Sequence, residues 1–160
     1  MSLTLSELER FVVELTNSPE HWQHLVRHAE DLRVYDQIWD EDQVNAWVIC
    51  WSTDQDTGFH DHHKSGAAIS VISGEVHEDR MRLGAQPRSR TFRAGETFAV
   101  PADAIHRVLH SGSGPAVTIH AYSPPLVLTG AYRVSSAGEL HREVLSVDEE
   151  LRAEPALSRL

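Results

Sequence analysis

Two histidines that lie two residues apart, His60 and His62, suggest chemistry by their type and spacing. Side chains at positions i and i+2 of a β-strand point to the same face, so both imidazoles can reach one metal ion. Asp61, between them, would point to the opposite face and is not expected to bind the same ion. The pair therefore predicts part of a metal site, which a distant third histidine would complete with another neutral nitrogen.

The composition is that of one globular domain and argues against several kinds of partner. The chain has 160 residues, of which 41% are hydrophobic, and a formal net charge of −10 without a cluster of lysine and arginine. Nucleic acid and anionic membrane surfaces are therefore not expected partners. We find neither a signal peptide nor a transmembrane segment, and the single cysteine, Cys50, lies in an apolar run as a small buried residue would. A reducing, cytoplasmic setting is expected, and the oligomeric state is left open.

The first thirty residues have the spacing of helices. Leu5, Leu8, Val12 and Leu15 recur every three or four positions, and Thr4 is placed to cap the helix that they predict. A second helix is predicted after it, with Ser18 as its N-cap, Pro19 in its first turn, and an apolar face made of Trp22, Leu25, Val26 and Ala29.

After this helical front, short β-rich runs alternate with turn signals, which favours a sandwich or barrel. The expected strands are 32–39, 44–51, 67–73, 75–83, 90–92, 97–100, 106–110, 116–122, 132–134 and 140–146. We therefore predict a single domain, 1–160, with a helical front (1–30), a β-barrel (32–147) and a tail (148–160) that begins with a short helix or frays.

Two segments resemble the signature motifs of the cupin family. The first motif is a histidine pair followed by a glutamate and a turn glycine; here it has His60 and His62, Ala67 in the glutamate's place, and Gly74. The second motif places a histidine after a glycine and a proline, and here that histidine is His106. The resemblance implies a mainly β, jelly-roll-like cupin β-barrel behind an N-terminal pair of α-helices, with His106 as the third metal ligand.

Alanine in the place of the glutamate changes the chemistry that such a site would have. Most metal cupins bind their ion with three histidines and one glutamate. With Ala67, the ligand set is three neutral imidazoles, so a divalent ion keeps its full charge and has open positions on one face. Such an ion attracts anionic substrate atoms, thiolate above all.

A third segment resembles a strand of the cysteine dioxygenases, which are cupin thiol dioxygenases. Residues 118–125 read Thr-Ile-His-Ala-Tyr-Ser-Pro-Pro, and the family's strand ends in Ser-x-His-x-Tyr-Ser-Pro-Pro. Thr118, His120 and Tyr122 would share one strand face and form a hydrogen-bonded relay that ends in a phenol near the metal. Vertebrate members cross-link this tyrosine to a cysteine at the place of Ala67, so Tyr122 is expected to be an unmodified phenol here.

The same resemblance indicates residues for the far end of the substrate. Cysteine-selective members have an arginine two residues after the tyrosine that matches Tyr35, where this chain has Gln37. Glutamine cannot make the charged, two-pronged contact of arginine with a carboxylate. Members that oxidise 3-mercaptopropionate also have glutamine there and use an arginine farther along, for which Arg133 is the nearest candidate. We predict that Tyr35, Gln37 and Arg133 bind the polar end of the substrate.

These observations predict a non-haem Fe(II) thiol dioxygenase. It would bind iron through His60, His62 and His106, and would use O2 to oxidise a small carboxylate-bearing thiol, of the cysteine or 3-mercaptopropionate type, to its sulfinate. One alternative is a metal-dependent cupin enzyme that acts on a non-thiol. Another is a cupin that binds a small ligand without chemistry.

Overall fold

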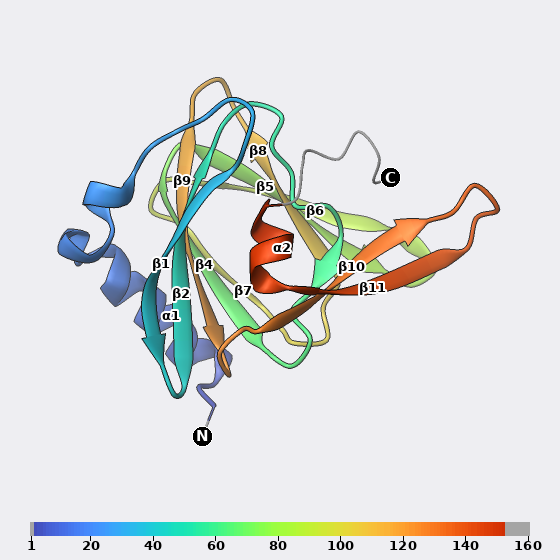
Figure 1. Cartoon of the computed structure of the whole chain (residues 1–160), viewed down its shortest axis with the longest axis horizontal. Coiled ribbons are helices and arrows are strands. Elements are labelled where there is room, and N and C mark those ends of the chain that lie inside the picture. The colour runs from blue at the N-terminus through green and yellow to red at the C-terminus, as the bar shows by residue number, and fades with distance from the viewer. Residues whose placement is uncertain (1, 153–160) are drawn as a thin grey trace.

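Two β-sheets face each other and form the body of the molecule, as Figure 1 shows for the computed structural model, which describes residues 2–152. One sheet has five strands in the order β1-β2-β9-β4-β7, and the other has six in the order β11-β10-β3-β8-β5-β6. The strand pairs that build the two sheets are antiparallel. The predicted mainly β, jelly-roll-like fold is confirmed, as two facing sheets rather than one closed barrel.

The strands follow one another with short turns between most of them. Their bounds are β1 (Val34–Glu41), β2 (Val44–Trp51), β3 (His60–Asp61), β4 (Gly66–Ser73), β5 (Glu75–Arg82), β6 (Ala85–Arg93), β7 (Thr97–Val100), β8 (His106–Ser111), β9 (Ala116–Ser123), β10 (Leu128–Val134) and β11 (Leu140–Ser146).

The helical front is one α-helix followed by two short 3-10 turns. In α1 (Leu5–Thr16), the Thr4 hydroxyl accepts from the Glu7 backbone and the Glu7 carboxylate accepts from the Thr4 backbone, which confirms the predicted cap. The predicted second α-helix is wrong. The chain there forms η1 (Pro19–His21) and η2 (Gln23–Leu25), and the Ser18 side chain caps neither. The Ser18 hydroxyl instead donates to the Glu14 carbonyl of α1, so the segment that follows begins without a side-chain cap and does not extend into a full helix.

Strand β2 shows how the fold buries two cores, because all eight of its residues are buried. Trp47, Ile49 and Trp51 alternate toward the core between the two sheets. Ala46, Val48 and Cys50 point to the other face and belong to the core beneath α1. Cys50 is thus the small buried residue that was predicted, and burial raises the pKa of its thiol.

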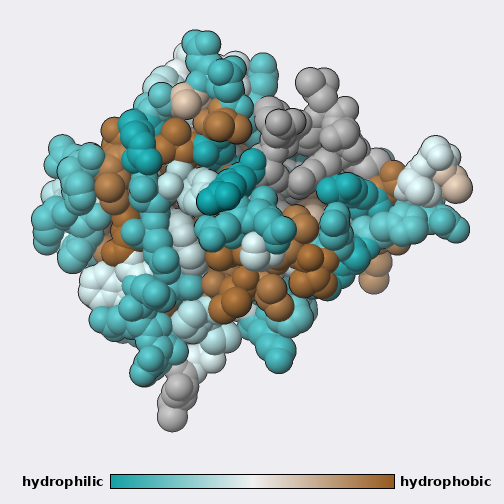
Figure 2. Space-filling view, in the orientation of Figure 1, coloured by the Kyte–Doolittle hydropathy of each residue, from teal (hydrophilic) through white to brown (hydrophobic). Residues whose placement is uncertain are grey.

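A short C-terminal helix, α2 (Val147–Arg152), lies in the opening between the two sheets (Figure 1). Its Leu151 is buried in the core between the sheets, and Val147 packs against the same core. On the face shown in Figure 2, apolar side chains gather where α2 meets the start of β10. The predicted tail therefore begins as a helix, and residues 153–160 lie outside the described part of the chain. Among the described residues, no helix is long and apolar enough to cross a membrane.

Candidate metal centre

Three buried imidazoles converge between the two sheets. Nε2 of His62 lies 3.2 Å from Nε2 of His60 and 3.3 Å from Nε2 of His106. Within the described chain, these three residues form the group whose ligand atoms could hold one ion. The exposed fractions of their side chains are all 5% or less, so the cluster is closed to bulk water. The structure brings together the three residues that the sequence singled out as metal ligands.

Strand pairing explains how residues far apart in sequence meet here. β3 lies between β10 and β8, and its residue His60 pairs directly with His106 of β8. β3 ends at Asp61, so His62 lies just beyond the strand rather than on it. His63 then has a positive φ of 58°, which turns the chain away. His60 and His62 nevertheless point inward, as the spacing predicted.

The second ring nitrogen fixes the orientation of two of the three imidazoles. Nδ1 of His60 lies 3.0 Å from the Gly58 carbonyl oxygen, so it donates its proton there. Nδ1 of His106 lies 3.0 Å from Oε1 of Glu78, which is itself buried. Both contacts place the proton on Nδ1 and leave the Nε2 lone pair aimed at the centre of the cluster.

Electrostatics keep the imidazoles in their metal-binding form. Burial, followed by the neighbouring histidines, holds the pKa of His62 well below its usual value, and burial does the same for His106. Both rings are therefore neutral at neutral pH. The donor set fits a divalent transition-metal ion, because three neutral nitrogens leave further positions for exogenous ligands.

Asp61 points away from the cluster, as expected, and anchors the turn between the two histidines. Its carboxylate accepts from Arg142 Nε at 2.7 Å and Nη2 at 2.8 Å, and from the Tyr132 hydroxyl at 2.7 Å. These hydrogen bonds outweigh burial and hold the pKa of Asp61 well below its usual value. Both partners belong to β10 and β11, so this hairpin holds the turn in place. The absence of a side chain at Gly130 makes room for the Arg142 guanidinium.

The predicted relay is present on β9. Nε2 of His120 lies 2.9 Å from the Thr118 hydroxyl, and Nδ1 lies 3.2 Å from the Tyr122 hydroxyl. Trp51, which the sequence reasoning did not assign to the relay, donates from Nε1 to the Thr118 hydroxyl at 2.9 Å. The Tyr122 ring meets the His62 ring edge-on, with centroids 5.0 Å apart, so the relay ends beside the imidazole cluster.

Ala67 lies directly opposite Tyr122 where β4 pairs with β9, and it is fully buried. Its methyl group offers no metal ligand and no sulfur for a bond to the phenol. The position therefore has the two consequences that the sequence predicted, a purely imidazole cluster and an unmodified tyrosine.

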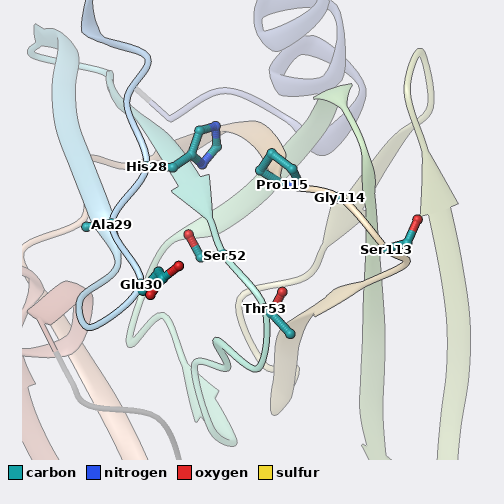
Figure 3. A pocket seen from close by; sticks show the side chains of 8 residues that line it. All are labelled: His28, Ala29, Glu30, Ser52, Thr53, Ser113, Gly114 and Pro115. Carbon is teal, nitrogen blue, oxygen red and sulfur yellow. The ribbon is translucent and has the colours of Figure 1, made fainter.

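A small cavity of about 20 Å³, enough for one water molecule, adjoins the cluster and the relay. It is lined by Arg33, Ile49, Thr57, His60, His62, His120, Tyr122, Leu126, Thr129, Val147 and Leu151. A larger cavity of about 470 Å³ lies elsewhere, among the loop segments around His28, Ser52 and Gly114 (Figure 3). None of the three clustered histidines lines that cavity, whereas the smaller one is lined by His60 and His62 together with the relay, so we place the candidate site there.

The residues predicted for the polar end of the substrate do not line this cavity. Gln37 is exposed on β1, and Arg133 is half-exposed on β10 with Nη2 3.2 Å from the Glu143 carboxylate. Tyr35 is half-buried, and its hydroxyl accepts from Arg152 Nε at 3.0 Å. Arg33 does line the cavity, and sequence reasoning missed it. It precedes β1, so strand alternation gave no signal for it.

The family model described as cysteine dioxygenase type I matches residues 6–135. The chain belongs to this family. It is 24% identical to cysteine dioxygenase type 1 of Danio rerio over 136 residues, which cover 78% of this chain and 67% of the relative. It is 22% identical to the Rattus norvegicus protein of the same name, over 77% of this chain and 66% of the relative. The chain thus spans about two thirds of the length of these cysteine dioxygenases.

Solved structures support the cupin fold of this family member. A Thermus thermophilus protein superposes with a TM-score of 0.57 at 17% identity, over 64% of this chain and 93% of its own. A cupin superfamily protein from Desulfitobacterium hafniense gives a TM-score of 0.54 at 13% identity, over 64% of this chain and 87% of its own. At these identities the likeness concerns the fold alone, which agrees with the predicted cupin architecture.

Proposed function

We propose that this protein is a non-haem Fe(II) thiol dioxygenase. Its substrate would be a small carboxylate-bearing thiol of the cysteine or 3-mercaptopropionate type, and its product the sulfinate. The observation that carries the proposal is the combination, in a member of the cysteine dioxygenase type I family, of three convergent buried imidazoles with the relay that ends at Tyr122. The relay gives no evident advantage to a cupin that only binds a ligand or acts on a non-thiol.

The reaction is RS⁻ + O2 → RSO2⁻, in which both oxygen atoms form bonds to sulfur and the O–O bond breaks. Fe(II), bound by Nε2 of His60, His62 and His106, would supply adjacent positions for the thiolate and O2 and would couple their electron transfer. The charge of the ligand set supports thiolate as the partner. Three neutral nitrogens leave the charge of the ion uncompensated, so the site favours the anionic form of the thiol.

The relay has a consistent direction of proton donation. Indole Nε1 of Trp51 can only donate, so the Thr118 hydroxyl accepts from it and keeps its own proton, which we propose it donates to Nε2 of His120. Burial, with the neighbouring His60 and Arg33, lowers the pKa of His120 to about 3, so the ring is neutral. It then donates from Nδ1 to the Tyr122 oxygen, which holds the phenol at the end of the relay, beside His62. Tyr122 would stabilise negative charge that develops on oxygen or sulfur.

The closed cavity would exclude water from the reacting atoms. The apolar side chains of Ile49, Leu126 and Leu151 line it beside the histidines and the phenol. A dry site strengthens the hydrogen bond from Tyr122 and protects a thiolate from protonation by solvent. The need for a reduced thiol supports a reducing compartment, and we propose a cytoplasmic location.

The test is thiol-dependent O2 uptake by protein loaded with Fe(II) under anaerobic conditions. Cysteine, 3-mercaptopropionate, mercaptosuccinate and cysteamine are supplied in turn, and sulfinate is measured by mass spectrometry. We expect sulfinate with a carboxylate-bearing thiol and none from the His106→Ala variant. Tightly bound metal without sulfinate from any of these thiols would contradict the proposal.

A further inference from the structure

Arg33 places a permanent positive charge in the wall of the cavity beside the imidazole cluster. Its side chain is 7% exposed, and the cavity that it lines is also lined by His60, His62 and Tyr122. A guanidinium stays protonated at any physiological pH, and its burial is costly unless other groups compensate. Among the described residues that line this cavity, Arg33 is the one arginine or lysine.

Contacts from three segments fix the plane of this guanidinium. Nε donates to the Leu151 carbonyl of α2 at 3.2 Å, and Nη1 donates to the Asp56 carbonyl, in the loop before β3, at 3.2 Å. The guanidinium carbon also lies 5.4 Å from the centre of the Trp51 ring. A guanidinium has five donors in a fixed fork, so it is already held in the flat geometry that a carboxylate binds.

The same contacts connect Arg33 to the relay. Trp51, over which the guanidinium lies, donates to Thr118, the residue that orients His120. The charge of Arg33 is also one of the causes that lower the pKa of His120, after burial and His60. A ligand held by Arg33 would therefore have the relay and the imidazole cluster along the same wall.

We propose that Arg33 binds the carboxylate of the thiol substrate and sets the preference of the enzyme for anionic thiols. This inference rests on the proposed function. The Leu151 carbonyl occupies the Nε donor with an oxygen, and the substrate carboxylate replaces it. The cavity of about 20 Å³ holds one water molecule, so binding of a thiol requires the lining, to which α2 contributes Val147 and Leu151, to open.

The position of Arg33 agrees with the chemistry better than that of the residues predicted from the sequence. Gln37 is uncharged and exposed. Arg133 is half-exposed and pairs with Glu143, away from the lining. Position 37, where cysteine-selective relatives have an arginine, is uncharged in this chain. Arg33, four residues earlier, supplies a positive charge at the cavity instead.

The experiment compares two thiols of similar size, 3-mercaptopropionate and the uncharged 3-mercapto-1-propanol, in the Fe(II)-loaded enzyme. In Arg33→Gln, we expect KM for 3-mercaptopropionate to rise about tenfold or more while KM for the alcohol changes less than about threefold. Arg133→Gln is the matched control and should leave both KM values unchanged. Arg33→Lys keeps the charge but loses the fork, and should lie between wild type and Arg33→Gln.

Each outcome has a distinct meaning. Equal loss for both thiols in a folded Arg33→Gln variant, or a selective loss in Arg133→Gln, would overturn the inference while leaving the dioxygenase activity in place. If thermal melting shows that Arg33→Gln does not fold, the wild-type enzyme still decides: equal kcat/KM for the two thiols overturns the inference, and a strong preference for the acid, weakened in Arg33→Lys, supports it. The failure of every thiol with the wild-type enzyme would instead contradict the proposed function.

Discussion

The carboxylate of Glu78 lies 3.0 Å from Nδ1 of His106, on the opposite side of the ring from the nitrogen that faces His62. Glu78 is 2% exposed and also accepts from Arg80 Nη2 at 2.8 Å. A buried carboxylate that binds the outer nitrogen of a metal-binding histidine fixes its tautomer and makes it a better ligand. The strand β5 therefore contributes to the metal centre without supplying a ligand.

Replacing Glu78 should weaken metal binding without removing a ligand. In Glu78→Gln we expect the Fe(II) affinity to fall by about 10- to 100-fold, because the amide can neither compensate charge on His106 nor fix its proton as well. The measurement is competition with a chelator of known affinity. Glu75→Gln, on the same strand and paired with the exposed Arg93, is the control and should bind as wild type. Equal affinities in Glu78→Gln and wild type would contradict the role.

Removing one of the clustered imidazoles should abolish retention of the metal. We expect His106→Ala to lose Fe(II) on desalting, because two neutral nitrogens hold a divalent ion weakly. Metal content is measured by elemental analysis. The control is His63→Asn, next to the cluster in sequence but exposed; asparagine tolerates its positive φ of 58°. Wild-type metal content in His106→Ala would show that the ion binds elsewhere.

The phenol should affect turnover more than metal binding. In Tyr122→Phe we expect kcat to fall by about 10- to 100-fold with metal content unchanged, because a hydrogen-bond donor is lost beside the reacting atoms. Phenylalanine keeps the edge-on contact with His62, so the cluster should remain intact. A variant with full kcat would place Tyr122 outside the chemistry, whereas a loss of metal would give it a structural role instead.

The buried His120 predicts how stability depends on pH. Its pKa is about 3 in the folded protein against an ordinary value of 6.5, chiefly because of burial. Between these values the unfolded chain binds the extra proton, so the stabilisation is complete above pH 6.5 and is lost as the pH falls toward 3.

Denaturation of metal-free protein at pH 7.5 and pH 5 tests this dependence. Relative to His120→Gln, the free energy of unfolding of wild type should drop by up to about 1.4 kcal/mol for each pH unit below 6.5. A difference between the two proteins that stays constant with pH would show that His120 does not carry this proton linkage.

A methyl group at Gly130 should disturb the metal centre from a distance. In Gly130→Ala, the new Cβ would overlap the Arg142 guanidinium and push it off Asp61. The turn that carries His60 and His62 would then lose its anchor, and we expect weaker Fe(II) binding with the fold retained. Gly138→Ala tests the general effect of an alanine in the same hairpin, since nothing surrounds a Cβ there. Unchanged affinity in Gly130→Ala would separate the anchor from the metal site.

The sequence predicted the parts of the site that depend on regular strand geometry. Thr118, His120 and Tyr122 share a face because β9 is a regular strand, and the alternation rule applies to it directly. His60 and His62 converge although β3 ends between them, so the rule succeeded there with the help of the Asp61 anchor. Strand bounds were most accurate where turn residues are clear, as for β2, β7 and β11.

The parts that depend on tertiary contacts could not be predicted. Arg33 precedes β1, and its role depends on the packing of α2 against the opening between the sheets. Glu78 and Arg142 approach the histidines only through the pairing of β5 with β8 and of β10 with β11. The failed second helix reflects the same limit, because the sequence does not show that the Ser18 hydroxyl donates back to the Glu14 carbonyl and leaves the following segment without a cap.

The hairpin formed by β10 and β11 extends from the body of the molecule, and its Arg142 binds a carboxylate 81 positions away in sequence (Figure 1). We therefore expect metal binding and the docking of this hairpin onto Asp61 to stabilise each other. Whatever ion the histidines hold should slow the exchange of the hairpin's backbone amides with solvent, and fraying of the hairpin should speed release of the ion. Amide exchange in β11, an edge strand of the six-stranded sheet, would thus indicate whether the buried site holds an ion.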